Sequence, residues 1–483
     1  MGLGVWLGLT LSSLFFYPLV ASADAQVVLL HWQPRHTGEL LIAFALFALL
    51  GTLIVEAGNR SASKLAPAVL LILVSVPVCS FGFAMLRLAP GGSSFAPWAA
   101  SSAVRITIAA VAAAIVAVTL LRPDLARRAV RTALLALSPI VVVVLLGMAR
   151  LIDGEDANGK VNPAPAAKNR STRAHVLVLL FDELSYSHLY EKTGEIRSDY
   201  PALRRLGSEA THYHAASAPG GETLVSLPGF LSGRRYHDAD ASGDSLQEVA
   251  ADGRRQPLDV NTPENLFRRA RAAGFRTELF GWYLPYCRMM PSVLDRCEAY
   301  SLYNASSVRP AFSLLDPVRT TFILWPHQFP AGLLKNPAFA DHQRLLTSYL
   351  ETQAGAPFQA DASVFRFIHF SVPHVPFVFD RNGYSPPFDP VSERIEPYER
   401  QVGYVDRIVE RILEALERRG DAPLTTVVVT SDHEFRAVTP REQWPHVPVI
   451  VRAPQATSRT DVRSPVRAEE VLRALLVTTA AHE

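Results

Sequence analysis

Five long apolar runs without a charged residue lie in the first third of this 483-residue chain, and they restrict its fold more than any other feature. The runs cover residues 3–22, 40–55, 65–86, 106–121 and 132–149. As helices, the longest can cross a hydrocarbon core of about 30 Å, and the 16-residue runs can do so with their flanking residues. We therefore expect residues 1–152 to form an α-helical transmembrane anchor of about five spans.

The first apolar run has two interpretations. The sequence VASADA at residues 20–25 has the small residues of a cleavage site, which would make the run a cleaved signal peptide. No Lys or Arg stands before the run, however, and this favours a helix that is retained. We expect the run to stay in the protein as the first span.

Basic residues between the runs predict the orientation of the anchor. Arg60 and Lys64 separate the second and third runs. Four arginines separate the fourth and fifth runs, namely Arg122, Arg127, Arg128 and Arg131. Because basic loops stay in the cytoplasm, the fifth span would carry the rest of the chain across the membrane. We expect a multi-pass protein of a bacterial-type inner membrane, with its second half on the periplasmic or extracellular side.

The second half begins with a polar stretch. Residues 153–173 are rich in Pro, Ala and Asn, which is typical of a juxtamembrane linker. Residues 174–483 are enough for one large domain core. The formal net charge of the chain is only +2, and no basic run is interleaved with aromatic residues, so nucleic acid is not an expected partner.

Apolar, β-branched runs alternate with helical patterns through residues 174–483. Strands are predicted at 175–181, 276–282, 363–370, 425–431 and 447–451. Helices are predicted at 262–275, with Thr262 as the cap and Pro263 at the first position, and at 404–420, ended by Gly420. Continuous Val, Leu and Ile runs separated by helices favour an α/β domain with a mostly parallel sheet covered by helices.

Two of the three cysteines lie close together in the second half. Cys287 and Cys297 are ten residues apart, whereas Cys79 lies in the third apolar run. An oxidising compartment favours a short-loop disulfide between the first two. The alternative is a pair of unpaired thiols.

Acidic and imidazole side chains follow two of the predicted strands. Asp182 and Glu183 come directly after the strand at 175–181, and Asp432 and His433 come directly after the strand at 425–431. One acidic pair alone would be a polar strand end or a helix cap. Because parallel strands end at the same edge of a sheet, the two groups together predict a divalent-metal centre there.

Three further histidines have a similar context. His369 and His374 lie five residues apart at a strand end, where Pro373 excludes a helix, and His446 precedes the last predicted strand. Any one of them alone would be a structural histidine more often than a ligand. Together they can bind a metal or the anionic oxygens of a substrate.

Two hydroxyls compete for the role of nucleophile in the segment GGETLVSLP. Thr223 and Ser226 both lie where a helix is expected to open after two glycines. A hydroxyl becomes nucleophilic at neutral pH when it binds a metal or lies at the positive end of a helix. The residues alone leave both candidates open.

Five elements of residues 174–483 resemble, in order, the motifs of the alkaline phosphatase superfamily in its sulfatase-like branch. They are FDEL at 181–184, the segment around Thr223, IHFSVPH at 368–374, TSDHE at 430–434 and HVPVIVRAP at 446–454. An anchor of five spans joined to such a domain is similar to the membrane-bound phosphoethanolamine transferases and lipoteichoic acid synthases. The resemblance implies the α/β fold of that superfamily.

The resemblance also selects the nucleophile. Leu231-Ser232-Gly233 is similar to the Leu-Thr-Gly triplet whose Gly follows the sulfatase nucleophile by ten residues, and counting back ten residues from Gly233 gives Thr223. The transferases place a Thr five residues before a Pro, and Thr223 and Pro228 have that spacing. Both comparisons favour Thr223 over Ser226.

The family pattern implies roles for the other residues. It implies metal binding by Glu183, Thr223, Asp432 and His433, with Asp182 as a further ligand. It gives His369, His374 and His446 the tasks of holding phosphoryl oxygens, protonating the leaving group or binding a second metal. The chain departs from the pattern at Glu434, which replaces the Gly of SDHG, and it lacks the cysteine-rich pattern of the colistin-resistance-type transferases.

These resemblances imply a metal-dependent enzyme that acts on an anionic ester. We expect it to transfer a phosphoethanolamine or phosphoglycerol head group from a phospholipid donor, through phospho-threonine, to an envelope glycan or lipid. Zinc or manganese suits the carboxylate and imidazole ligands, and adjacent carboxylates would also tolerate calcium. The alternatives are a sulfatase-like hydrolase of phosphate or sulfate esters and a catalytically silent envelope assembly protein.

Overall fold

The protein is described here by a computed structural model. It describes residues 2–32, 34–60, 74–75, 78, 81, 117, 121–153, 174–242, 245–308, 312–324, 337–389 and 395–481. The chain divides into two compact units. The first comprises Met1–Glu155 and Tyr303–Phe339, and the second comprises Asp156–Leu302 and Ala340–Glu483. The segment Tyr303–Phe339 therefore interrupts the second unit in sequence but belongs to the first.

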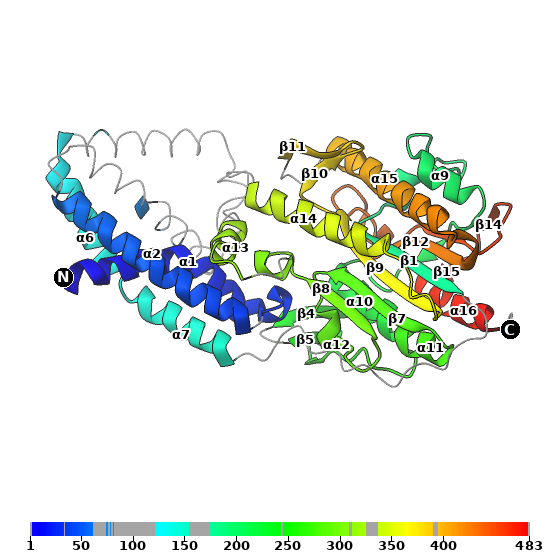
Figure 1. Ribbon diagram of the computed structural model, residues 1–483, viewed down its shortest axis with the longest axis horizontal. Helices are drawn as coiled ribbons and strands as arrows, with labels where there is room; N and C mark the ends of the chain where they lie inside the picture. The colour runs from blue at the N-terminus through cyan, green and yellow to red at the C-terminus, as the bar shows by residue number, and fades with distance from the viewer. Residues whose placement is uncertain are drawn as a thin grey trace. The chain divides into compact units, whose positions relative to one another are not determined.

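Two helices of the first unit are long and apolar enough to cross a membrane. α1 (Gly2–Leu30) contains the candidate span Leu3–Ala21, and α2 (Pro34–Arg60) contains the candidate span Arg35–Ala57. The two helices pack closely (Figure 1). Gly8 permits this approach, because the Cβ atom of any larger residue there would lie only 2.4 Å from the backbone oxygen of Ala48. The third and fourth predicted spans fall almost entirely outside the described residues.

The fifth predicted span is not one continuous helix. α6 (Pro123–Ala136) and α7 (Ile140–Asp153) meet at a bend of 45°, so the prediction of a single helix over 132–149 was wrong. Pro139 lies in the break and has no backbone N–H to continue the helix. Three of the arginines predicted in a loop lie on α6 instead. Among the described residues there are two candidate spans, or three if the bent pair counts as one.

The second unit contains an eight-stranded sheet in the order β14-β2-β13-β12-β1-β9-β7-β8. Five neighbouring strands are parallel, as the sequence predicts: β12 (Thr425–Ser431), β1 (His175–Asp182), β9 (Val364–Pro373), β7 (Arg276–Trp282) and β8 (Arg296–Tyr300). Every residue of β1, β9 and β12 is buried. This agrees with their mostly apolar sequences, since a parallel sheet is covered on both faces.

The far edge of the sheet is mixed. β13 (Val449–Arg452) runs antiparallel to β12, β2 (Thr211–Tyr213) runs antiparallel to β13, and β14 (Thr460–Val462) is parallel to β2. The last predicted strand is therefore present but reversed relative to the central five. The antiparallel edge explains why the sheet is mostly, and not wholly, parallel.

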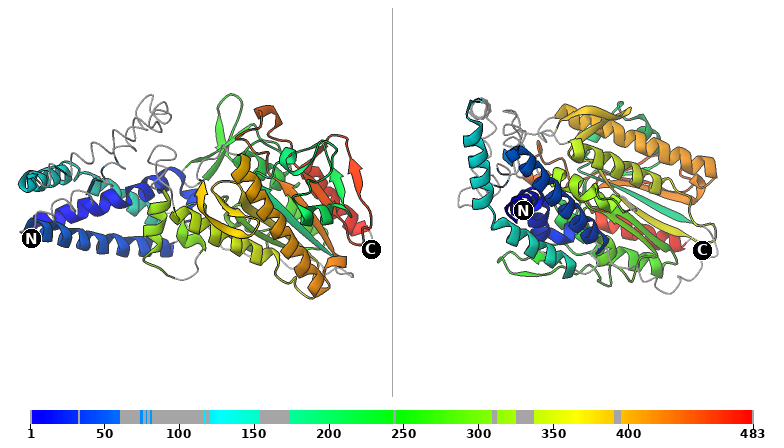
Figure 2. Two further views of the ribbon diagram at one scale, coloured as in Figure 1. Left: turned by 90° about the horizontal axis from the view of Figure 1, so that it is seen from above. Right: turned by 60° about the vertical axis from the view of Figure 1, so that its left-hand side comes forward.

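Helices cover both faces of the sheet (Figures 1 and 2). α10 (Thr223–Ser232), α11 (Leu266–Ala272) and α16 (Ala468–Ala481) contact one another on one face. α15 (Ile395–Arg419) lies on the other face against β9 and α9 (Pro201–Gly207). Gly420 ends α15 with a φ of 73°, in the left-handed region that a glycine adopts easily.

The start of α11 differs from the prediction. The helix begins at Leu266, and its cap is Asn265, whose side chain accepts from the backbone N–H groups of Phe267 and Arg268. Thr262 instead donates to the backbone oxygen of Ser232. Thr262 is therefore not the cap, because Asn265 satisfies two free N–H groups that Thr262 lies too early in the chain to reach.

The remaining elements are short, except the long helix α14. These elements are α8 (Tyr186–Leu189), β3 (Ala216–Ser217), β4 (Asp238–Ser242), β5 (Ser245–Val249), β6 (Arg255–Pro257), α12 (Tyr286–Met289), η2 (Ala305–Val308), α13 (Asp316–Leu324), α14 (Pro337–Ala354), β10 (Phe377–Asp380), β11 (Gly383–Asp389), η4 (Ala422–Leu424), η5 (Arg441–Gln443) and β15 (Val466–Arg467).

Cys287 of α12 and Cys297 of β8 form a disulfide, with their Cα atoms 5.5 Å apart.

A buried arginine on β9 predicts a large stability effect. Arg366 is buried, pairs with Glu278 at 2.6 Å and donates to the backbone oxygens of three residues before β9. Arg366→Met should lower the free energy of unfolding by about 3 kcal/mol or more, because it leaves Glu278 and the carbonyls unpaired. Thermal unfolding of the detergent-solubilised protein measures this.

The matched control is Arg344→Met, which removes a half-exposed ion pair with Asp341 on α14. It should cost less than about 1 kcal/mol, since exposed pairs contribute little. Equal effects of the two substitutions would contradict a structural role for Arg366.

Candidate metal centre and nucleophile

The centre forms where β1 and β12 end side by side. The two strands pair in register up to Phe181 and Ser431, so Asp182 and Asp432 follow at the same edge of the sheet. Asp432 accepts from the backbone N–H of Glu183 at 3.1 Å, which ties the two strand ends together. Parallel pairing thus brings two carboxylates together although they lie 250 residues apart in sequence.

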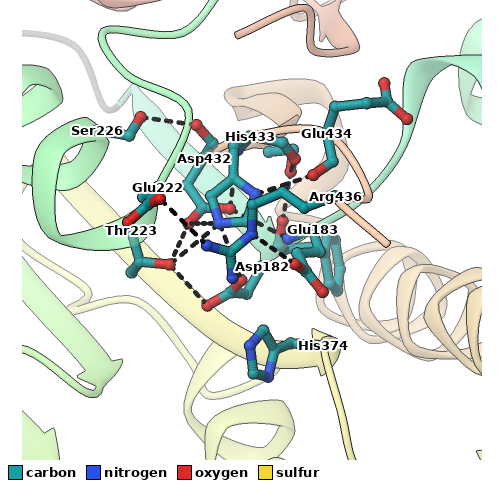
Figure 3. Close-up of polar contacts among 12 residues, drawn as sticks. Asp182, Glu183, Glu222, Thr223, Ser226, His374, Asp432, His433, Glu434 and Arg436 are labelled. Atoms are coloured by element: carbon teal, nitrogen blue, oxygen red, sulfur yellow. Dashed lines mark hydrogen bonds and ion pairs between the residues drawn. The ribbon is translucent and has the colours of Figure 1, made fainter. Parts of the chain in front are cut away.

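Thr223 lies against this pair. Its Oγ1 atom is 2.8 Å from Asp432 Oδ2, 3.2 Å from His433 Nε2 and 3.4 Å from Asp182 Oδ2 (Figure 3). All four side chains are buried. The structure therefore brings together four of the predicted site residues, with the hydroxyl at the middle of the group.

The local fold explains why Thr223, and not Ser226, occupies this position. Thr223 is the first residue of α10, so its hydroxyl lies at the positive end of the helix. Ser226 lies one turn later, and its Oγ donates to the backbone oxygen of Asp432 at 2.7 Å. The Ser226 hydroxyl thus bonds to the backbone of Asp432, whereas the Thr223 hydroxyl faces the carboxylates.

Hydrogen bonds fix the orientation of His433. Its Nδ1 donates to the backbone oxygen of Glu434 at 2.9 Å, and its backbone oxygen accepts from Ser431 Oγ at 2.8 Å. The remaining ring nitrogen, Nε2, faces Thr223 and the two carboxylates. A metal-binding histidine characteristically has its other nitrogen bonded to an oxygen in this way.

The residues fit a divalent cation. Asp182, Asp432 and His433 each offer one ligand atom, and these atoms lie within 4.8 Å of one another. Asp182 Oδ1 is buried and has no hydrogen-bond partner among the described residues, which is costly for a carboxylate oxygen. Two carboxylates and an imidazole suit zinc or manganese, and the geometry does not choose between them.

The electrostatics of the centre also favour a cation. Burial would raise the pKa of Asp182, but three neighbouring imidazoles, His374 first among them, outweigh it and lower that pKa. Burial and the charge of Asp182 raise the pKa of Asp432. Burial disfavours the charged form of His433, but the two carboxylates outweigh it and raise its pKa. The charge of Asp182 thus disfavours the charged form of Asp432, and a divalent cation between the two carboxylates would relieve that repulsion.

Glu183, to which the resemblance gives a ligand role, is buried and pairs with an arginine. Its backbone has a φ of 64°, in the left-handed region, and its Oε1 pairs with Arg436 Nε at 3.0 Å. Asp182, the further ligand of the family pattern, lies among the candidate ligand atoms. The unusual backbone turns the Glu183 carboxylate toward Arg436, at the border of the centre.

His369 is a supporting residue in this structure. It is fully buried, and its Nε2 accepts from Trp282 Nε1 at 3.0 Å. An indole N–H only donates, so Nδ1 of His369 carries the proton and donates to Tyr286 Oη at 2.8 Å. His369 Nε2 also lies 3.6 Å from Asp182 Oδ2. The ring therefore packs behind Asp182.

The other two predicted histidines lie in different surroundings. His374 is partly exposed, its Nδ1 donates to the backbone oxygen of Val375 at 2.8 Å, and Figure 3 shows its ring near Asp182. His446 donates from Nε2 to the backbone oxygen of His214 and packs against the ring of Tyr186. In the described part of the chain, no hydrogen bond or ion pair joins His446 to the centre.

Two further residues border the site: Arg436 has no sequence signal, and Glu434 is marked in the sequence only as a departure from the family pattern. Arg436 lies between Glu183 and Glu222, at 3.0 and 3.9 Å, and burial works against its charge while Glu183 raises its pKa. Glu434 is buried and accepts from the backbone N–H of Tyr186 at 2.9 Å. An Arg in a loop is usually a surface residue, so only its position shows that it faces the centre.

The fold and the centre define an α/β domain with a buried hydroxyl, two carboxylates and an imidazole at the carboxyl edge of its sheet. A family model described as Sulfatase matches residues 174–479, which is well over half of the chain. The chain therefore belongs to the sulfatase family, in the sulfatase-like branch of the alkaline phosphatase superfamily. It is accordingly an enzyme of that superfamily.

Solved structures show similar chains. The phosphonate monoester hydrolase from Silicibacter pomeroyi is 18% identical, with a TM-score of 0.44 over 64% of this chain and 73% of that one. A sulfatase from Pseudoalteromonas sp. is 13% identical, with a TM-score of 0.42 over 64% of this chain and 68% of that one. A comparison with curated proteins finds no match.

The raised pKa of His433 predicts how metal binding depends on pH. Its Nε2 keeps a proton to higher pH than an ordinary imidazole, and a metal must displace that proton. The affinity for zinc or manganese should therefore rise with pH, with most of the rise above pH 6.5, the usual imidazole pKa. Calorimetric titration of the purified protein between about pH 5.5 and 8.5 measures this. An affinity that is already constant by pH 6.5 would contradict the assignment.

Proposed function

We propose that the protein is a membrane-anchored phosphotransferase that moves a phosphorylated head group from a phospholipid to an acceptor hydroxyl, with Thr223 as the nucleophile. The observation that carries the proposal is the position of Thr223 Oγ1, within 3.4 Å of Asp182, Asp432 and His433. An unmodified Thr cannot become the formylglycine of sulfatases, which makes a phosphate ester the better substrate class.

In the first step, Thr223 Oγ1 attacks the phosphorus atom. Its proton passes along the 2.8 Å hydrogen bond to Asp432, whose raised pKa makes it a better acceptor than an ordinary carboxylate. The bond between phosphorus and the diacylglycerol oxygen breaks, and a protonated His374 donates a proton to the leaving oxygen. The product is phospho-threonine bearing the head group.

In the second step, the hydroxyl of the acceptor attacks the same phosphorus. His374, now neutral, takes the proton of that hydroxyl, and Thr223 leaves and recovers its proton from Asp432. A divalent metal bound by Asp182, Asp432 and His433 would lower the pKa of the Thr223 hydroxyl and neutralise phosphoryl charge. Both steps use the same residues in opposite directions.

Arg436 has the position and charge to hold the transferred phosphoryl group. Its guanidinium lies at the border of the centre, between Glu183 and Glu222 (Figure 3), and it stays partly exposed. Its planar donors suit the oxygens of a phosphate. We assign it the anionic oxygens that do not react, a role that the predicted histidines were expected to fill.

The lipid donor follows from the anchor. The two apolar helices α1 and α2 can hold the protein in a membrane, and a phospholipid there would be the most abundant phosphate diester available to Thr223. We place the catalytic half on the periplasmic side of a bacterial-type inner membrane. Hydrolysis of a phosphate or sulfate ester is the second candidate, because the family description favours it and only the acceptor differs.

Removal of the Thr223 hydroxyl tests the proposal. Thr223→Ala should lower the release of diacylglycerol from vesicles of phosphatidylethanolamine and phosphatidylglycerol on the order of 10³-fold or more, because no other group can form the intermediate. Thin-layer chromatography of the lipids measures this. Thr223→Ser retains a hydroxyl and should recover part of the activity.

Ser226→Ala is the control, since it removes only the hydrogen bond to the backbone of Asp432. It should cost about tenfold or less, as expected for one lost hydrogen bond. The proposal fails if Thr223→Ala retains activity. If no lipid is consumed while a soluble aryl phosphate or sulfate is hydrolysed in a Thr223-dependent way, the hydrolase is the correct function.

Substitution of Arg436 tests its role in anion binding. Arg436→Met should lower kcat/KM for the phosphate substrate about 10- to 100-fold, the usual range for a charge-assisted hydrogen bond. Arg441→Met is the matched control, because both arginines lie over the ring of Trp444 but Arg441 is not paired with Glu183. Equal losses from both variants would show that packing on Trp444, and not phosphate binding, explains the effect.

A further inference from the structure

The segment Tyr303–Phe339 has an unexpected place in the molecule. In sequence it lies inside the sulfatase domain, from just after β8 into the first turn of α14, yet it belongs to the same compact unit as the apolar helices. α13 of this segment packs against α1 and α2 (Figure 1), and the rings of Phe322 and Phe15 meet edge to face at 5.6 Å. The sulfatase domain thus contributes part of its own chain to the membrane-type unit.

Polar contacts join the segment to the first turns of α2. Ser313 donates its backbone N–H to Oε1 of Glu39 at 3.1 Å, and Asn304 contacts Nδ1 of His36 at 3.2 Å. Glu39 lies four residues into the span that starts at Arg35, which is about 6 Å along the helix. A carboxyl at such a depth needs a partner, and the segment supplies one.

The end of α7 also lies near the start of α2. Thr37 Oγ1 lies 3.5 Å from the backbone oxygen of Leu151, near the end of α7, after which the linker 153–173 begins. Leu151, near the end of α7, and Asn304 of the segment therefore both lie near the start of α2. In the orientation proposed above, this end of α2 faces the catalytic side of the membrane.

The two most exposed of the large apolar side chains in the described part of the segment lie within two residues of Ser313. Phe312, next to Ser313, is 58% exposed and Leu315 is 60% exposed, which matches Leu53 of the span in α2, at 58%. Exposed apolar residues of the described second unit, such as Leu424, are single and scattered. Exposed apolar side chains beside a membrane span are typical of residues that contact lipid.

We propose that residues 303–308 and 312–324 belong to a membrane-inserted element of the sulfatase domain, with Phe312 and Leu315 in the lipid leaflet on the catalytic side. Its partner is the phospholipid bilayer itself. The element would fix the catalytic half at the surface from which its lipid donor comes. This inference rests on the membrane anchoring and the lipid donor proposed above.

Lipid contact at Phe312 is tested in the full-length protein in phospholipid vesicles. A Cys79→Ala background leaves no thiol outside the disulfide, so a single added cysteine can carry an environment-sensitive fluorophore. Phe312→Cys is compared with Leu53→Cys in the span and with Leu424→Cys in the second unit. Nitroxide-labelled phospholipids should quench the label at 312 to about the extent seen at 53, and they should leave the label at 424 unquenched.

The comparison of quenching at positions 312, 53 and 424 decides whether Phe312 contacts lipid. Quenching at 312 no stronger than at 424 would overturn the proposal. Because the measurement needs no turnover, it stays decisive even if the lipid is not a substrate and the proposed function fails. All three labelled positions are exposed in the structure, so the label displaces no packed side chain.

A second variant connects the element to catalysis. Phe312→Ser together with Leu315→Ser should raise KM for vesicle phospholipid severalfold and leave the hydrolysis of a soluble aryl phosphate within about twofold, since the site itself is untouched. Unchanged KM for vesicle lipid would contradict the role in donor access. Equal losses on both substrates would also contradict it, because they would show damage to the catalytic fold.

Discussion

The parallel pairing of β1 with β12 is the constraint on which the site depends. It places Asp182 beside Asp432 at one edge of a sheet whose central strands are buried, where neither carboxylate can be solvated by water. The protein provides part of the compensation, with His433 and the hydroxyl of Thr223 within 3.7 Å of the pair. A divalent cation would neutralise the remaining negative charge. The unfavourable burial of the two carboxylates would therefore favour the binding of a metal and, with it, of an anionic substrate.

The central architecture was predictable because its signal is local. β1, β9 and β12 are mostly apolar and buried along their whole length, and the meeting of the carboxylates at the ends of β1 and β12 follows from parallel alignment. The choice of Thr223 over Ser226 needed two spacings from the family resemblance, and the structure adds a physical reason, since Ser226 is bonded to the backbone of Asp432. Thr262 was wrong as a cap because the competing Asn265 has the better geometry.

The surroundings of the other site residues depend on tertiary contacts that the sequence does not show. A sequence pattern does not show that the backbone of Glu183 turns into the left-handed region, nor that its carboxylate then meets Arg436. His369 has the sequence context of a ligand, yet Trp282 and Tyr286 engage both of its nitrogens. The membership of Tyr303–Phe339 in the first unit was equally hidden, because its contacts join residues more than 250 positions apart.

The most direct test of the account is the mass of the intact protein after brief incubation with phosphatidylethanolamine or phosphatidylglycerol and zinc or manganese. The account predicts an added phosphoethanolamine or phosphoglycerol mass, located on Thr223 by fragmentation and absent from Thr223→Ala. An adduct on any other residue, or turnover of the lipid by Thr223→Ala, would contradict the central claim that Thr223 carries the transferred group.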